Sequence, residues 1–189
     1  MRLRHQSLIA AVIIFILAVG LLIYSNRTAN LPDAETNAET APHRVAPKAT
    51  KAKIHLYFAN EECSYLTAED RGLALPANVV GRAKQIVNAL IDGPETLLTP
   101  TIPKQTKLLA LYVTEQGIAY ANFNRTISDQ HPGGSFSELL TIFSIVNTLC
   151  LNISDINAVK ILIEGHEAKT LAGHVDIQMP FQPNLLMVK

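Results

Sequence analysis

The chain has 189 residues, carries 16 basic and 16 acidic side chains, has no formal net charge at pH 7 and contains no tryptophan. From Lys53 onward it holds 10 of those basic and 13 of those acidic side chains, so its main part is mildly acidic. An acidic surface with few aromatic rings lacks the positive charge and the stacking platforms that nucleic acids require, which argues against a nucleic-acid partner.

An apolar run lies close to the first residue. Leu8–Tyr24 (LIAAVIIFILAVGLLIY) has no charged side chain and, at about 17 residues, is just long enough to cross the hydrocarbon layer as a helix. Arg2 and Arg4 precede the run and Arg27 follows it, so the positive-inside bias places residues 1–7 in the cytoplasm. The sequence therefore predicts a single-pass protein of the cytoplasmic membrane. Its C-terminal part would lie on the periplasmic or cell-surface side.

Two other uses of such a run are weaker matches. A cleaved signal peptide needs small residues at its cleavage site, and Ser25, Asn26 and Arg27 make a poor one. A lipoprotein needs a cysteine directly after the run, but the first cysteine is Cys63. The sequence favours an uncleaved signal anchor over residues 8–24 and leaves cleavage open as the alternative.

A polar segment follows, over residues 25–52. It is rich in Ala, Thr, Asn and charged residues, and Pro32, Pro42 and Pro47 oppose regular structure. Such a composition buries too little apolar surface to offset the entropy lost on ordering. The segment is predicted to be a disordered tether.

The globular part opens with a strand and a helix. Alternating apolar residues predict a strand over Lys53–Ala59 and less regular extended pieces over Tyr65–Leu75. The apolar side chains of Val79–Asp92 fall on one stripe, which indicates an amphipathic helix. Asn78 suits its N-cap, and Gly93 suits the left-handed position that ends a helix.

The second half contains strands on either side of one long helix. The predicted segments are strands Lys107–Thr114, Ile118–Phe123, Ala158–Glu164 and His174–Met179, and a helix Ser135–Leu151. The first two strands are joined by a short turn, so they are expected to pair as an antiparallel hairpin. Ser135 and Glu138 form an S-x-x-E capping box at the start of the helix.

Together these elements predict one small α+β domain over residues 53–180, followed by a C-terminal tail over residues 181–189. The domain would have two layers, with two helices on one face of a mostly antiparallel sheet. The strand Leu108–Val113 is apolar on both faces. The second face of the sheet is therefore expected to be covered by the remaining chain or by a partner.

One cluster near the C-terminus contains metal-binding residue types. His166 and His174 lie near Glu164, Glu167 and Asp176. Their spacing matches no metal motif known to us. No metal site is predicted there.

Other polar residues resemble catalytic sites only in composition. Asp129, His131 and Ser135 or Ser137 are the types of a hydrolase triad, but no G-x-S-x-G nucleophile elbow is present. The stretch 93–95 (GPE) lacks the Lys-Ser/Thr of a phosphate loop.

The two cysteines leave one question open. Cys63 and Cys150 are not spaced as a redox motif. In an oxidising compartment they would either form a disulfide or remain two separate thiols.

Several stretches together resemble the GerMN domain family of sporulation and spore germination. They are IHLYFA in the opening strand, ALIDGP at 89–94, TPTIPKQTKLL with its Ile102-Pro103, GGSFSELLTIFSIVNTL at 133–149 and VKILIEG…LAGHVDIQMP at 159–180. The resemblance implies a small fold similar to the ring-building motif of secretion and sporulation assemblies. It also implies an extracytoplasmic, membrane-tethered setting and no established catalytic residue. In this family the LAGH-D stretch is a fold signature, so His174 and Asp176 are expected to make buried hydrogen bonds.

The sequence therefore predicts a non-catalytic, membrane-tethered module for protein interaction or assembly in the cell envelope, with no cofactor. No catalytic, cofactor-binding or metal-ligating residue is assigned. The expected partners are other envelope proteins, including peptidoglycan-associated ones, or a second copy through the sheet face. Leu8–Tyr24 supplies the membrane contact. The alternative is a small-ligand-binding or hydrolytic domain of the envelope.

Overall fold

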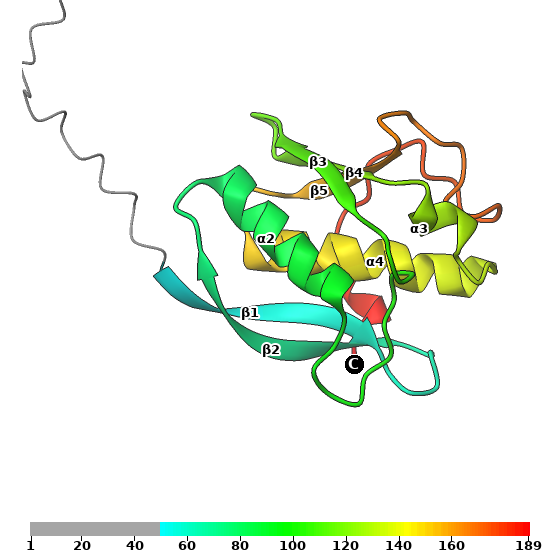
Figure 1. Cartoon of the computed structure of the whole chain (residues 1–189), viewed down its shortest axis with the longest axis horizontal. Helices are drawn as coiled ribbons and strands as arrows, with labels where there is room; N and C mark the ends of the chain where they lie inside the picture. The colour runs from blue at the N-terminus through cyan, green and yellow to red at the C-terminus, as the bar shows by residue number, and fades with distance from the viewer. Residues whose placement is uncertain (1–49) are drawn as a thin grey trace, which may run out of the picture. The chain divides into compact units, whose positions relative to one another are not determined.

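A computed structural model of the chain describes residues 50–189 (Figure 1). The predicted cytoplasmic terminus, membrane helix and most of the tether lie outside the described residues, and those predictions stay predictions. The elements are β1 (Thr50–Ala59), β2 (Leu66–Leu75), α2 (Val79–Asp92), β3 (Leu108–Val113), β4 (Ile118–Phe123), α3 (Thr126–Asp129), α4 (Ser135–Asn152), β5 (Ala158–Ile163) and the 3-10 helix η1 (Leu185–Met187).

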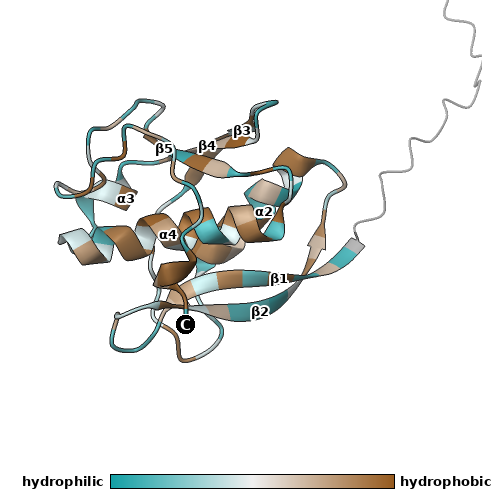
Figure 2. Ribbon diagram, turned by 180° about the vertical axis from the view of Figure 1, so that it is seen from behind, coloured by the Kyte–Doolittle hydropathy of each residue, from teal (hydrophilic) through white to brown (hydrophobic). Residues whose placement is uncertain are grey.

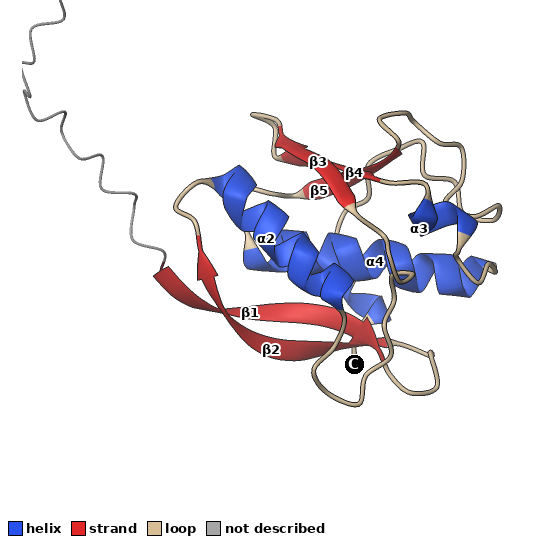
Figure 3. Ribbon diagram, in the orientation of Figure 1, coloured by secondary structure: helices blue, strands red, loops and turns tan. Residues whose placement is uncertain are grey.

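The strands form two sheets rather than one. β1 and β2 pair antiparallel along their whole length, while β4 lies between β3 and β5, antiparallel to β3 and parallel to β5. Helices α2 and α4 lie between the two sheets (Figure 3), and each contacts strands of both. The α+β class is confirmed, but the prediction of two layers with helices on one face of a single sheet is wrong.

Helix α4 explains the third layer. Ten of its residues are buried, and they are spread around the helix rather than confined to one stripe. A helix whose apolar and polar faces are both buried must be covered on all sides, so it packs between sheets (Figure 2). Among the described residues α4 alone is long and apolar enough to cross a membrane, but 61% of that stretch is buried inside the domain, as in a core helix.

Buried polar side chains on α4 complete the free edge of β1. Asn152 accepts the backbone N–H of His55 at 2.9 Å and donates to its C=O at 2.7 Å. Two residues along the strand, Thr148 accepts the N–H of Tyr57 and Ser144 donates to its C=O. These three polar side chains recur every fourth residue, so one face of the helix replaces a neighbouring strand.

The first helix and the hairpin agree with the sequence prediction. The side chain of Asn78 accepts the backbone N–H of Gly81 at 2.6 Å, as an N-cap does, and Gly93 has φ 93°. β3 and β4 form the expected antiparallel hairpin, with a bulge near the start of β3.

Other segments differ from the prediction. Residues 66–75 form one continuous strand, since all of them pair with β1. Residues 126–129 form the short, unpredicted helix α3. No strand is found over 174–179 in the described chain, where only Thr170 and Asp176 form an isolated bridge.

Both ends of the domain extend beyond the predicted limits. β1 begins at Thr50, and residues 181–189, predicted to be a tail, pack against the domain. The side chain of Asn147 on α4 exchanges two hydrogen bonds with the backbone of Asn184. The backbone N–H of Lys189 donates to the C=O of Leu66 at one end of β2.

Candidate functional surfaces

A buried carboxylate joins α4 to the loop after β5. Glu138 is 0% exposed and accepts the backbone N–H groups of His174 (3.1 Å) and Val175 (2.9 Å). The ring Nδ1 of His174 lies 2.8 Å from the same carboxylate. Burial by itself would raise the pKa of Glu138, but the hydrogen bonds from this loop outweigh it and keep the pKa below its usual value. Because an ionised carboxylate only accepts, Nδ1 donates in its contact with Glu138; the backbone N–H of Gly134 also lies 3.3 Å from Nδ1.

Glu138 does not make the predicted capping box. Gly134, rather than Ser135, is the N-cap of α4, and it provides no side-chain hydrogen bond. Nor are His174 and Asp176 buried, as the family signature suggested; both are exposed, and the side chain of His174 is half exposed. A glutamate four residues into an apolar helix was the available signal for a buried charge, but a cap explained it equally well.

Two other acidic residues of the cluster considered as a metal site, Glu164 and Glu167, contact different partners. Glu164 accepts the backbone N–H of Arg125 at 2.8 Å, and Glu167 lies 3.7 Å from the buried ammonium of Lys160. Over residues 50–189 no group of three His, Cys, Asp or Glu side chains gathers in one place. The structure thus brings His174 to Glu138 and leaves His166 apart from both.

His131 takes part in a hydrogen-bond chain that excludes the candidate serines. Its Nδ1 accepts the N–H of Gly133 at 3.0 Å, so Nε2 bears the proton and donates to Thr141 Oγ1 at 2.9 Å. The hydroxyl of Thr141 then donates to the C=O of Thr101. Burial lowers the pKa of His131, partly opposed by Glu138, so the neutral ring is favoured. This series of hydrogen bonds fixes the loops that contain His131 and Thr101 onto α4.

Glu69 is a second buried carboxylate, which the sequence did not single out. Its side chain faces inward from β2, beside the guanidinium of Arg71. It accepts the backbone N–H groups of Glu95 and Thr96 as well as the hydroxyl of Thr96. The loop after Gly93 therefore already binds an anion, the protein's own carboxylate.

A cavity of about 290 Å³ lies beside the first two turns of α4. Phe136, 47% exposed, is its largest lining side chain. Three prolines and four hydroxyl side chains line it as well, and they are Pro100, Pro103, Pro132, Thr99, Thr101, Ser137 and Thr141. Such a concave, mostly apolar space with a few hydroxyl groups has the character of a small-ligand site.

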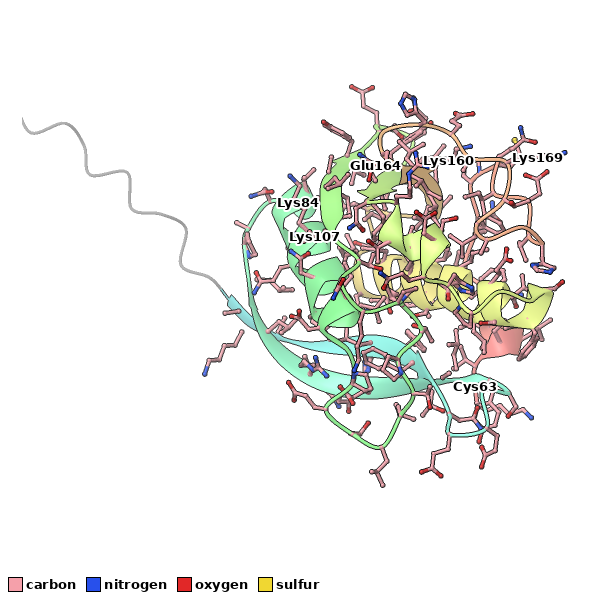
Figure 4. All side chains as sticks on the ribbon, turned by 45° about the vertical axis from the view of Figure 1, so that its right-hand side comes forward. Cys63, Lys84, Lys107, Lys160, Glu164 and Lys169 are labelled. Atoms are coloured by element: carbon pink, nitrogen blue, oxygen red, sulfur yellow. The ribbon has the colours of Figure 1, made fainter. Side chains whose placement is uncertain are left out.

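The two cysteines are free thiols. Cys63 is exposed at the tip of the β1–β2 hairpin, where it borders this cavity. In Figure 4 it lies at the opposite end of the domain from Lys160 and Glu164. Cys150 lies on α4, and burial raises its pKa to about 11, so its thiol stays protonated and unreactive.

The three-stranded sheet exposes large side chains on β3. Tyr112 is 66% exposed and Leu109 is 49% exposed. Leu111, between them, is 1% exposed because it faces the helices. The expectation that this strand is apolar on both faces is met, and one of those faces is at least partly open to solvent.

Taken together, two sheets around a buried, loop-binding helix define a small α+β scaffold. The family model for Germane, described as sporulation and spore germination, matches residues 55–169. This is more than half of the chain, and the chain belongs to that family. The resemblance to GerMN domains is confirmed.

Three solved structures that are similar to this chain come from Clostridium perfringens and Bacillus subtilis. A putative lipoprotein from Clostridium perfringens is 26% identical, with a TM-score of 0.51, over 70% of this chain and 87% of that one. The first GerMN domain of the Bacillus subtilis sporulation protein GerM is 22% identical, with a TM-score of 0.52, over 70% and 96%. The tandem GerMN domains of GerM are 22% identical, with a TM-score of 0.55, over 72% of this chain but only 46% of theirs. No curated protein matches the chain.

Proposed function

We propose that this protein is a non-catalytic module for protein interaction or assembly in the cell envelope, tethered to the membrane by residues 8–24. Family membership supports a sporulation or germination context. The similarity to a putative lipoprotein supports display outside the cytoplasm. The apolar run with its preceding arginines supports the anchor.

The observation that carries the proposal is the contrast between buried polar and exposed apolar side chains. Glu69, Glu138 and Asn147 are buried, and each bonds to backbone groups that position a loop or the C-terminal residues. Tyr112 and Leu109 instead project large apolar groups into solvent from an ordered strand. The buried polar groups of this domain stabilise its own loops. The exposed apolar surface is therefore the part that is available to bind a partner.

The experiment compares binding and folding in the same variants. Full-length protein carrying Tyr112→Asp is solubilised from membranes and used to recover envelope proteins, with Asn88→Asp on the exposed side of α2 as the charge-matched control. Tyr112→Asp should reduce partner recovery while thermal unfolding stays within about 1 °C of wild type, since exposed substitutions change stability little. Unchanged recovery with Tyr112→Asp would remove the sheet face from the proposal.

The cavity beside Phe136 supports a second candidate function, binding of a small apolar ligand. Phe136→Ala would remove its largest wall without disturbing the bonds of Thr141. Loss of a ligand that native mass spectrometry detects on the wild-type protein would favour this alternative over the interaction module.

A further inference from the structure

One long edge of the β1–β2 sheet is open. His55 and Tyr57 of β1 direct their backbone groups away from β2, because they bond to α4. In an antiparallel ladder with this register, the even-numbered residues of β2 must then turn their backbone groups away from β1. Apart from Leu66, which Lys189 contacts, these residues are Ala68, Asp70, Gly72 and Ala74, and all four are exposed. We call them the open edge of β2, which lies at the margin of the domain in Figure 1.

The other sheet edges in the described part of the chain are closed over most of their length. α4 covers β1 at His55 and Tyr57, while the exposed Lys51 and Lys53 leave a short open stretch at the start of that strand. The backbone of Phe181 exchanges two hydrogen bonds with Val159 of β5. β3 directs the backbone of Leu111 toward its own free edge, but Leu111 is only 1% exposed, so neighbouring residues cover that edge. Lys189 occupies the Leu66 end of β2. Over residues 50–189 the open edge of β2 is the longest stretch of strand backbone that is accessible to another strand.

Gly72 lies in the middle of this edge, and nothing within the domain requires a glycine at that position. Its φ lies outside the positive range that favours glycine, and nothing lies within 4 Å of the place where a Cβ would stand. Glycine weakens a strand interior and often marks a place where another backbone approaches closely. β2 contains no proline or lysine, and the one charged side chain on its open edge, Asp70, forms an ion pair with Lys53 of β1.

We propose that the open edge of β2 pairs antiparallel with the open edge of a second copy of this chain. Two two-stranded sheets would then become one four-stranded sheet across a twofold axis. The contact uses the edge of one sheet, whereas the proposed function uses the exposed face of the other, so each can fail without the other.

Charge disfavours two of the possible registers. An axis through residue 70 would set Asp70 against Asp70 of the second copy, and an axis through residue 71 would oppose two Arg71 side chains. Like charges directly opposite each other destabilise a sheet. An axis through Gly72 avoids both. It places Asp70 opposite Ala74 of the second copy, next to the exposed Lys51 that pairs with Ala74 on β1. Lys51 and Asp70 of the other copy would then lie on the same face, two strands apart across the small side chain of Ala74, while Asp70 keeps its ion pair with Lys53 of its own copy.

The register also leaves the C-terminal residues in place. Pairing spans residues 70–74 of each copy, whereas Lys189 occupies the edge at Leu66. Such a short interface is weak in solution. The proposed membrane tether would strengthen it by raising the local concentration of the second copy.

The first test uses the full-length chain in detergent and in vesicles. Gly72→Lys places like charges at the axis and is expected to weaken self-association by about tenfold or more. Asn88→Lys adds the same charge on α2 and should leave association unchanged. Thermal unfolding checks that both variants fold. A monomeric wild-type chain, or a dimer that survives Gly72→Lys, overturns the proposal. If the wild-type chain is monomeric and Gly72→Lys instead abolishes binding of another envelope protein, the edge pairs with a strand of that protein. This result also overturns the proposal.

The second test locates the twofold axis by cross-linking. Its expected result is the appearance of a cross-linked dimer rather than a loss of association. In a Cys63→Ser background, Gly72→Cys should form a disulfide-linked dimer on oxidation, because paired Cα atoms at the axis lie about 5.5 Å apart. Ala68→Cys in the same background lies opposite Pro76 and should cross-link far less. Equal cross-linking at both positions contradicts the proposed pairing.

Discussion

The carboxylate of Glu138 and the ring Nδ1 of His174 lie 2.8 Å apart and connect the core helix α4 to the loop after β5. The same carboxylate accepts two backbone N–H groups of that loop. This buried side chain thus anchors the loop to α4, while hydrogen bonds between the loop's own residues and the buried Leu171 and Ile177 complete its packing. This contact explains how residues without regular secondary structure keep a fixed place in the domain.

The two partners should differ in their effect on stability. Glu138→Ala leaves two N–H groups without an acceptor and should lower the free energy of unfolding by about 3 kcal/mol. His174→Ala removes one hydrogen bond from a carboxylate that keeps its backbone donors, and should cost about 1 kcal/mol. Urea unfolding at neutral pH measures both, with exposed Glu61→Ala as the control. If His174→Ala folds normally but loses an activity or a bound metal, the non-catalytic proposal is wrong.

Acid should weaken the fold in two pH windows. Burial lowers the pKa of His131 in the folded protein below its ordinary value of 6.5. As the pH falls, the unfolded chain therefore binds this proton at a higher pH than the folded chain does. The stability this neutral ring provides is complete above 6.5 and falls as the pH drops below it. Glu138 has a pKa lowered from 4.5, so its contribution is complete above 4.5 and is lost as the pH falls further.

The upper window can be assigned with one variant. His131→Asn keeps an acceptor near the N–H of Gly133 but cannot be protonated in this range. The decline in urea midpoint between about pH 7 and pH 5 should be smaller in His131→Asn than in wild type. An equal decline in both proteins would place that acid sensitivity elsewhere.

Local patterns predicted the local structure. The stripe of Val79–Asp92 with Asn78 before it and Gly93 after it gave the helix α2 almost residue for residue. The β3–β4 hairpin followed from two strands and a short turn. In each case the interactions that decide the structure lie within a few residues, where periodicity and capping preferences apply directly.

The layer arrangement was not predictable in the same way. Ser144, Thr148 and Asn152 form a visible polar stripe within an apolar helix, but their partners on β1 lie about 90 residues away in sequence. Periodicity shows that a helix face is distinct and does not show what it contacts. The capping-box interpretation of Glu138 failed for the same reason, since its partners lie in a distant loop.

The polar stripe gives a further prediction. Asn152→Leu fills similar volume but leaves the N–H and C=O of His55 unpaired, and should cost about 2–4 kcal/mol. Leu151→Ala, one residue away and 39% exposed, should cost less than about 1 kcal/mol. Chemical denaturation of both variants makes the comparison, and equal losses would show that the stripe does not close the edge of β1.

The predicted membrane topology rests on Leu8–Tyr24 and its flanking arginines. A reporter enzyme that works only outside the cytoplasm should be active when fused after Lys189. Activity of a cytoplasm-only reporter at the same position would reverse the orientation. Mature protein that begins near Asn26 would show that the anchor is cleaved.

The last prediction concerns the limits of the folding unit. A fragment of residues 50–189 should fold cooperatively without the preceding chain, because β1 begins at Thr50 and the described core lies within it. Ending the same fragment at residue 180 removes the Asn147–Asn184 clamp and the partner of Leu66. It also uncovers the small apolar cluster beneath η1, which contains Tyr57 and Leu140. The shorter fragment should therefore be less stable by about 2 kcal/mol or more, from lost hydrogen bonds and lost apolar burial.

Asn184→Ala in the longer fragment keeps the backbone that meets Asn147 and should cost less than the deletion. Equal unfolding midpoints for the 50–180 and 50–189 fragments would return residues 181–189 to the status of a tail.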